Sequence, residues 1–295
     1  MVLEQGSLII RVMKKVYIII ISVFVFSGNA LFAGGGWPIP KAKGYFKLSQ
    51  LAIVANQYYS PSGEIIDIST ASIYISSLYG EYGLTDRLGV TAYVPFFSRA
   101  TLNEQVSPNG TLLAEGDAVN SLGDFDISLK YGLIVNKPIV VSATLTFGLP
   151  LGNSAGGDTQ VLQTGDGEFN IMLGLEASRS FDKGKGYVNT LVAFNNRSEN
   201  FSDEYRLGAE VGYRISSKVS GALKVLSVNS FENGSDLETP SNGIFSNNIE
   251  YLAISPEVNY FVNDSFGISA GIGFAASGKR VLAAPSFSIG LFKSL

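Results

Sequence analysis

The chain has 295 residues, of which 46% are hydrophobic and 16% charged, and its formal net charge is −4. This length suits one barrel or α/β domain, and the acidic balance argues against binding nucleic acid through a basic surface. The absence of cysteine and histidine excludes disulfides, thiolate metal sites, a lipoprotein anchor and histidine-dependent catalysis. The 33 glycines, 19 phenylalanines and 14 tyrosines favour many short strands separated by turns.

Residues 1–33 have the pattern of a cleaved signal peptide. Three cations precede an unbroken apolar run over residues 16–26, and small residues follow it. The run is much shorter than the roughly 20 residues that a spanning helix needs. We expect cleavage after Ala30 or Ala33, with Met13 as an alternative start. No later stretch is long and apolar enough for a spanning helix, so the mature chain is either soluble in the periplasm or crosses a membrane as strands.

Alternation of apolar with polar or small residues marks many segments, which is typical of strands and not of helices. In residues 204–215 the charged side chains of Glu204, Arg206, Glu210 and Arg214 all fall on one face. Facing lipid, each would cost up to about 2–4 kcal/mol near the bilayer midplane, so in a membrane barrel this face points inward. Periodicity alone does not distinguish such a barrel from a soluble sandwich, whose apolar face lies inside.

The alternating segments predict twelve strands of an antiparallel, all-β, up-and-down transmembrane barrel that occupies residues 44–295. The predicted strands are 44–57, 67–83, 87–98, 122–135, 139–150, 168–181, 187–197, 203–215, 219–230, 247–262, 265–276 and 284–295. Short turns alternate with longer links, which places both termini in the periplasm. Ten or fourteen strands are the alternatives. Residues 34–43 are predicted to be a flexible periplasmic lead-in, with insertion of residues 34–38 into the lumen as a second interpretation.

Some positions disturb the pattern. The alternation slips after Gln50 and again near Val225, where we expect β-bulges. Proline forfeits a ladder hydrogen bond in a closed sheet. Pro95, Pro150 and Pro285 fall near predicted strand ends, but Pro256 falls inside the strand 247–262, which makes that strand one of the weaker predictions.

Two segments resemble blocks of a known family. They are residues 82–90 (YGLTDRLGV), which lead to Val94-Pro95-Phe96, and residues 122–131 (LGDFDISLKY). They look like blocks of the outer-membrane barrel family named after the meta-cleavage pathway of phenol degradation, and residues 147–152 resemble the next strand end of that family. The resemblance implies an outer-membrane barrel that admits small compounds, aromatic ones among them.

The C-terminus departs from the usual outer-membrane assembly signal. Gly290 is in place, but Lys293 stands where an apolar residue is expected, and the chain ends in Leu295. We still expect the barrel-assembly machinery to act as a partner during insertion.

The charged residues on the inward faces are the candidate site. We expect no catalytic, metal or cofactor-binding residues and no enzyme, because a barrel without histidine lacks the usual hydrolytic constellations. The closest carboxylate pair, Asp124 and Asp126, is better explained as lumen wall than as a glycosidase site. The predicted lumen-lining residues are Asp124, Asp126, Lys130, Glu168, Glu176, Glu204, Arg206, Glu210, Arg214, Glu250 and Glu257.

The sequence supports two functions of different classes. The first is a channel in the bacterial outer membrane for passive uptake of small solutes, including aromatic or otherwise apolar compounds. Twelve strands suggest a narrow path with a mild cation preference, and the links 99–121 and 151–167 are candidates for a constriction. The second is a non-conducting structural or surface-binding barrel. The expected partners are outer-membrane lipid and a small-molecule solute, and we expect no nucleic acid.

Overall fold

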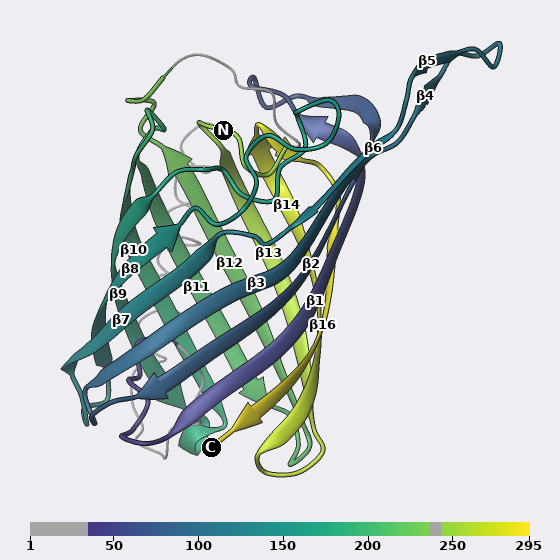
Figure 1. The fold of residues 1–295 in the computed structure, drawn as a ribbon. Helices are drawn as coiled ribbons and strands as arrows, with labels where there is room; N and C mark the ends of the chain where they lie inside the picture. Colours follow the sequence, from purple (N-terminus) through teal and green to yellow (C-terminus); the bar gives the residue numbers. More distant parts are fainter. Residues whose placement is uncertain (1–34, 236–242) are drawn as a thin grey trace, which may run out of the picture.

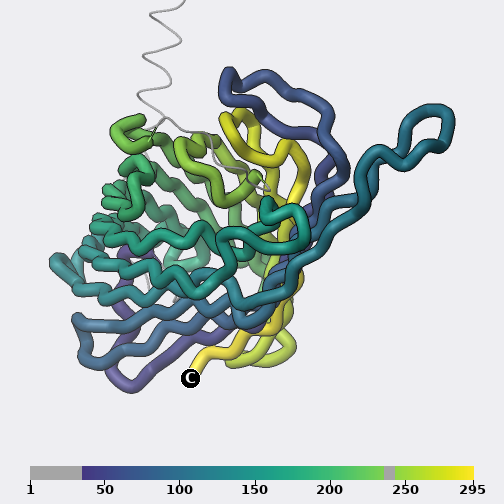
Figure 2. Tube along the Cα trace, turned by 45° about the horizontal axis from the view of Figure 1, so that its top comes forward, coloured from purple at the N-terminus to yellow at the C-terminus, as the bar shows by residue number. Residues whose placement is uncertain are grey.

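The computed structural model describes residues 35–235 and 243–295, which form one β-sheet closed on itself (Figures 1 and 2). Twelve long strands build the wall. They are β1 (Gly44–Tyr59), β2 (Ile65–Gly83), β3 (Leu88–Leu102), β7 (Phe125–Ile134), β8 (Val140–Leu149), β9 (Asn170–Phe181), β10 (Gly186–Arg197), β11 (Glu204–Arg214), β12 (Val219–Ser230), β13 (Glu250–Phe261), β14 (Phe266–Lys279) and β16 (Ser286–Ser294). The predicted twelve-stranded antiparallel barrel is therefore confirmed.

The barrel is closed by β1, which pairs with β2 on one side and with β16 on the other. Every other wall strand pairs with its neighbours in the chain, and all pairs are antiparallel. Closure leaves no unpaired edge, so the backbone polar groups of the wall are satisfied within the sheet, as a lipid surrounding requires.

The connections divide the barrel into two different ends, the turn end and the loop end (Figure 1). The turn end holds residues 84–87, 135–139, 182–185, 215–218 and 262–265 together with the C-terminus. The described residues at the loop end are 60–64, 103–124, 150–169, 198–203, 231–235, 243–249 and 280–285. The alternation of short and long connections matches the sequence-based prediction.

The loop end carries extra structure. In the segment 103–124, β4 (Gln105–Val106) and β5 (Leu112–Ala114) form a hairpin that projects away from the barrel in both views (Figures 1 and 2). Next along the chain, β6 (Asp117–Ser121) extends the wall by pairing with the upper part of β3. The loop 150–169 covers this strand, because buried Leu162 packs against Ala100 and Val119.

The expected bulges are not where the sequence placed them. The register runs unbroken past Gln50 and past Val225. The alternation slips at Gln50 because the inner face itself becomes apolar from Leu51 onward, with Ile53 and Ala55 on the same face. The prediction failed because it assumed a polar interior along the whole strand.

The prolines have different effects from those expected. Pro95 lies in the middle of β3, which is longer than predicted, at the point where β3 stops pairing with β7 and before it pairs with β6. Pro256 lies inside β13, and the ladder to β14 is interrupted between Ile254 and Glu257. Both strands therefore continue through a proline. β13 loses ladder pairs on the β14 side only, whereas Pro95 of β3 has no ladder partner on either side, because the register to β2 also shifts between Ser76 and Leu78.

The outer surface resolves the ambiguity between a membrane barrel and a soluble sandwich. Large apolar side chains on the outer face are exposed, for example Leu173 at 58% and Val192 at 59%. Their inward neighbours are polar or buried, such as Ser178 at 2% and Asn195 at 1%. The apolar face is therefore outside, which is the arrangement of a barrel surrounded by lipid.

Among the described residues, no helix is long and apolar enough to cross a membrane. The predicted signal peptide, residues 1–33, lies outside the described residues, so its cleavage stays a prediction.

Candidate functional site

The inner face of β11 shows how the sequence pattern places charge in the lumen. Glu204, Arg206 and Glu210 lie opposite Asn195, Ala193 and Asn189 of β10 and share their face. The alternate residues of β11 point outward, where Leu207 is 45% exposed. The charge of this strand therefore lies inside the barrel, as lipid outside would require.

Ion pairs connect inward side chains in the turn half of the barrel, some between neighbouring strands and some between strands further apart in the wall. Lys47 Nζ lies 2.8 Å from Glu257 Oε2, and Lys130 Nζ lies 3.7 Å from Glu176 Oε1. Lys224 lies 3.9 Å from both Glu210 and Glu257. Six strands, β1, β7, β9, β11, β12 and β13, thus contribute lysine–carboxylate contacts that brace the wall. Pairs that face water each add little to stability.

Arg197, at the loop-end edge of β10, is the centre of a second network. Its side chain is 6% exposed and contacts three carboxylates: Asp166 at 2.9 Å, Glu168 at 2.7 Å and Glu204 at 2.8 Å. Glu204 also accepts a bond from Arg206 at 2.8 Å. Because Asp166 and Glu168 belong to the loop 150–169, Arg197 fastens this loop to the wall.

Two carboxyl groups of this network have a raised pKa. Burial raises the pKa of Asp166 to about 6, although Arg197 favours its charged form. Burial also raises the pKa of Asp124, which accepts backbone hydrogen bonds from Gly152 and Asp166 at 2.8 Å each. Asp124 therefore ties the loop 150–169 to the start of β7.

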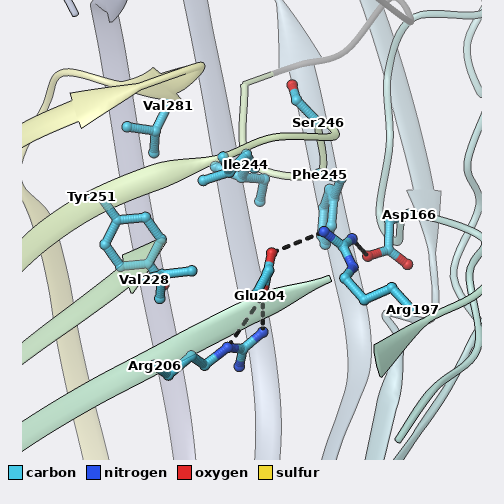
Figure 3. A pocket seen from close by; sticks show the side chains of 11 residues that line it. Asp166, Arg197, Glu204, Arg206, Val228, Ile244, Phe245, Ser246, Tyr251 and Val281 are labelled. Atoms are coloured by element: carbon cyan, nitrogen blue, oxygen red, sulfur yellow. Dashed lines mark hydrogen bonds and ion pairs between the residues drawn. The ribbon is translucent and has the colours of Figure 1, made fainter. Parts of the chain in front are cut away.

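A cavity of about 270 Å³ lies beside the Arg197 network (Figure 3). One side of it is polar, with Asp166, Arg197, Glu204 and Arg206. The other side is lined by Val228, Ile244, Phe245, Ile249, Tyr251 and Val281. Arg206 donates to Glu204 through Nε at 3.3 Å and Nη2 at 2.8 Å, which leaves Nη1 without a partner among the described residues. The cavity is thus amphipathic, with one guanidinium nitrogen available.

The apolar wall extends beyond the cavity. Ala55, Ala71, Ile73 and Leu282 form a buried cluster on the inner face of β1 and β2 and on β15 (Val281–Leu282). Ile244 packs against this cluster and also lines the cavity. The loop half of the lumen therefore has a charged side and an apolar side facing each other.

The segment before β1 lies inside the barrel. The Gly36 N–H donates to Ser178 Oγ at 2.8 Å, and its carbonyl accepts from Ser142 Oγ at 2.7 Å. Lys130 Nζ donates to the Gly35 carbonyl at 2.7 Å, and the Trp37 ring packs edge-on against Tyr187 at 6.0 Å between centroids. This placement differs from the flexible lead-in that the sequence favoured.

Most of the predicted lumen-lining residues lie on the inner face or in the loop-end network. Those on the inner face of wall strands are Asp126, Lys130, Glu176, Glu204, Arg206, Glu210, Arg214 and Glu257. Asp124 and Glu168 lie in the loop-end network. Glu250 differs: it shares the outer face of β13 with Leu252 and pairs with Lys279 at 2.8 Å. Glu250 and Glu257 are seven positions apart in a strand whose register to β12 is unbroken, so alternation places them on opposite faces and the prediction that both line the lumen was wrong.

Sequence reasoning missed several residues of the site. Arg197, Lys47 and Lys224 stand on strands whose alternation was read as weak or was not used to assign charge. Asp166 lies in the predicted link 151–167 and was not singled out there, yet it closes the network with Arg197. Strict alternation from Tyr187 to Arg197 places both on one face, and this signal could have identified Arg197.

No family model and no curated protein matches the chain. Solved structures match it at low identity. The COG4313 outer membrane channel from Pseudomonas putida F1 superposes with a TM-score of 0.60 at 13% identity, covering 90% of this chain and 100% of that one. The NanC porin gives 0.52 at 10% identity, covering 85% and 100%. The translocator domain of autotransporter NalP from Neisseria meningitidis gives 0.51 at 9%, covering 86% and 89%. These likenesses concern the fold, which is that of an outer-membrane β-barrel.

Proposed function

We propose that this barrel is an outer-membrane channel for the passive uptake of small amphipathic solutes, with aromatic or otherwise apolar bodies and one polar group. The observation that carries the proposal is the lumen of the loop half, where a charged wall faces an apolar wall across a cavity of about 270 Å³. A uniformly polar lumen would suit hydrophilic solutes, whereas apolar inner residues offer a body without hydrogen-bonding groups a surface to contact.

The charge balance of the cavity favours a neutral or cationic polar group. Arg197 is already paired with three carboxylates, and Arg206 is paired with Glu204 at 2.8 Å. An anionic group on the solute would therefore be repelled by the carboxylates around the cavity. A hydroxyl or amide oxygen can accept from Nη1 of Arg206 without that repulsion, while its apolar body contacts Val228 or Ile249.

Planar-bilayer recording with benzyl alcohol tests the proposal. We expect discrete conductance steps in KCl, and we expect millimolar benzyl alcohol to interrupt them. Arg206→Gln should weaken this block by roughly ten-fold or more, as expected for one lost hydrogen bond to a charged group. Arg99→Gln, at a residue that bonds to Asn120 outside the cavity, is the matched control and should leave the block unchanged. Block that is equal in all three proteins would contradict this solute class.

The second candidate is a structural or surface-binding barrel that does not conduct. The position of Gly35 to Trp37 in the lumen favours it, since these residues occupy space in the turn half. The two candidates differ in swelling of liposomes that contain the folded protein and are diluted into arabinose. Swelling supports the channel, and its absence together with electrical silence supports the structural barrel.

A further inference from the structure

The turn end of the barrel carries an excess of exposed cations. The exposed lysines and arginines at this end are Lys41, Lys43, Arg87, Lys137, Lys183, Lys185, Lys218 and Lys293. None of them forms an ion pair with a residue that the structure describes. The exposed side-chain carboxylates at the same end are Asp86, Asp182 and Asp264. This end is therefore strongly basic in a chain whose net charge is −4.

The cations are distributed around the whole perimeter. Four of the five turns carry one or two of them: Arg87 on 84–87, Lys137 on 135–139, Lys183 and Lys185 on 182–185, and Lys218 on 215–218. The fifth turn, 262–265, has none, but Lys293 of β16 pairs in register with Phe266 directly beside it. We call these six cations, together with Lys43 before β1, the basic ring.

The basic ring lies just beyond a belt of tyrosines on the outer face. Tyr82, Tyr131, Tyr213 and Tyr260 are 38%, 46%, 39% and 46% exposed, and each lies within three residues of its strand's turn end. Outward tyrosines mark the level where lipid chains give way to headgroups. The ring cations therefore stand at headgroup level, and Lys293, which shares the outer face with Leu291, can reach that level along the strand by extending its aliphatic stem.

The loop end has the opposite charge. Its exposed carboxylates are Glu64, Asp67, Glu104, Glu115, Asp158, Glu199 and Glu232. Its cations outside the Arg197 network, among the described residues, are Arg99, Lys279 and Arg280, and these are only partly exposed. The two ends of the barrel thus carry opposite charge, and only the turn end would attract an anionic surface.

We propose that the basic ring binds the anionic headgroups of phospholipids in the periplasmic leaflet. A protein partner would contact one sector of the rim, whereas the cations follow the perimeter, as an annular lipid layer does. A basic residue near an anionic membrane surface gains a favourable interaction that is lost at high salt. The ring thereby anchors the turn end to the leaflet on its own side, and it gives Lys293 a role that an apolar residue could not fill.

Lipid selectivity measured by electron spin resonance tests the proposal. The full mature chain is reconstituted in phosphatidylcholine vesicles, and spin-labelled phosphatidylglycerol is compared with spin-labelled phosphatidylcholine. We expect the wild type to prefer phosphatidylglycerol by about three- to five-fold at low salt, and by less than two-fold in 1 M NaCl, where the Debye length is about 3 Å. The quadruple variant Lys137→Gln, Lys183→Gln, Lys185→Gln, Lys218→Gln should lose most of the preference.

The matched control replaces the same four lysines with arginine, which keeps the charge. It should retain the wild-type preference. A wild type without preference for phosphatidylglycerol would overturn the proposal and favour an acidic protein partner instead. Loss of preference in both quadruple variants would also overturn it, because the lipid would then respond to the shape of the turns. The salt dependence of the wild type needs no variant, so the proposal stays testable if a variant fails to fold.

Discussion

Replacing Arg197 with methionine removes the only cation that contacts both carboxylates contributed by the loop 150–169 in the described network. In the wild type Arg197 is 6% exposed and lies 2.7 Å from Glu168 and 2.9 Å from Asp166. The change leaves the aliphatic volume nearly intact but deletes the guanidinium. Its effect therefore reports on charge and hydrogen bonding more than on packing.

The magnitude follows from what each carboxylate retains. Glu204 keeps Arg206 at 2.8 Å, and Asp166 can share a proton with Asp124, beside which its pKa is already raised. Glu168 is 1% exposed and keeps only Asn170 at 3.1 Å and the Ser198 N–H at 3.3 Å. One buried carboxylate thus loses its counterion, so we expect the free energy of unfolding to fall by about 3–5 kcal/mol at pH 8.

The loss depends on pH. Burial already raises the pKa of Glu168 in the wild type, although Arg197 favours its charged form, and removal of Arg197 raises this folded-state pKa further above the unfolded value. The destabilisation is therefore present above that raised pKa and diminishes as the pH falls through it. At pH 4, where the neutral acid predominates, we expect the loss to shrink to about 1–2 kcal/mol.

Urea unfolding in lipid vesicles measures these values, with the fluorescence of Trp37, the only tryptophan, as the signal. The double variant Arg197→Met, Glu168→Leu is the control, because it removes the orphaned charge with its partner. It should be more stable than the single variant at pH 8. A loss below about 1 kcal/mol at pH 8, or a loss equal at both pH values, would refute the assignment of Arg197 as the centre of the network.

Three further outcomes are expected. Because the pKa of Asp166 is about 6, this group is mostly charged at pH 7.5 and mostly neutral at pH 5. Reversal potentials in a KCl gradient should therefore show a weaker cation preference at pH 5 than at pH 7.5, and Asp166→Asn should remove this difference between the two pH values. In Gly83→Ala the new methyl carbon would meet the Pro40 carbonyl oxygen at 2.1 Å, so we expect the lead-in to move out of the lumen. The emission of Trp37 should then shift to the red and the conductance should rise, and unchanged values would contradict occlusion of the lumen by the lead-in. Leu173→Arg, at an outward position 58% exposed, should lower the free energy of unfolding by about 2–4 kcal/mol in a bilayer and much less in detergent that tolerates charge; equal losses in both would count against lipid contact.

The sequence by itself determined the strands and their order. A period of two residues, interrupted by turn residues at regular intervals, leaves few arrangements other than an antiparallel barrel of consecutive strands. The charged alternation of Glu204, Arg206, Glu210 and Arg214 also assigned the inner face of β11 once the surroundings were known to be lipid. These are local properties, which is why a single chain is enough to read them.

Only the tertiary structure decided what the lumen is like. The inner face turns apolar at Leu51, and a periodicity analysis that assumes a polar interior interprets this as a slip of frame. The grouping of Arg197 with Asp166 and Glu168 joins a strand to a loop about 30 residues away, and no spacing rule predicts such a contact. The same holds for Gly36 in the lumen, because whether a glycine-rich segment folds back depends on partners that become neighbours only when the barrel closes.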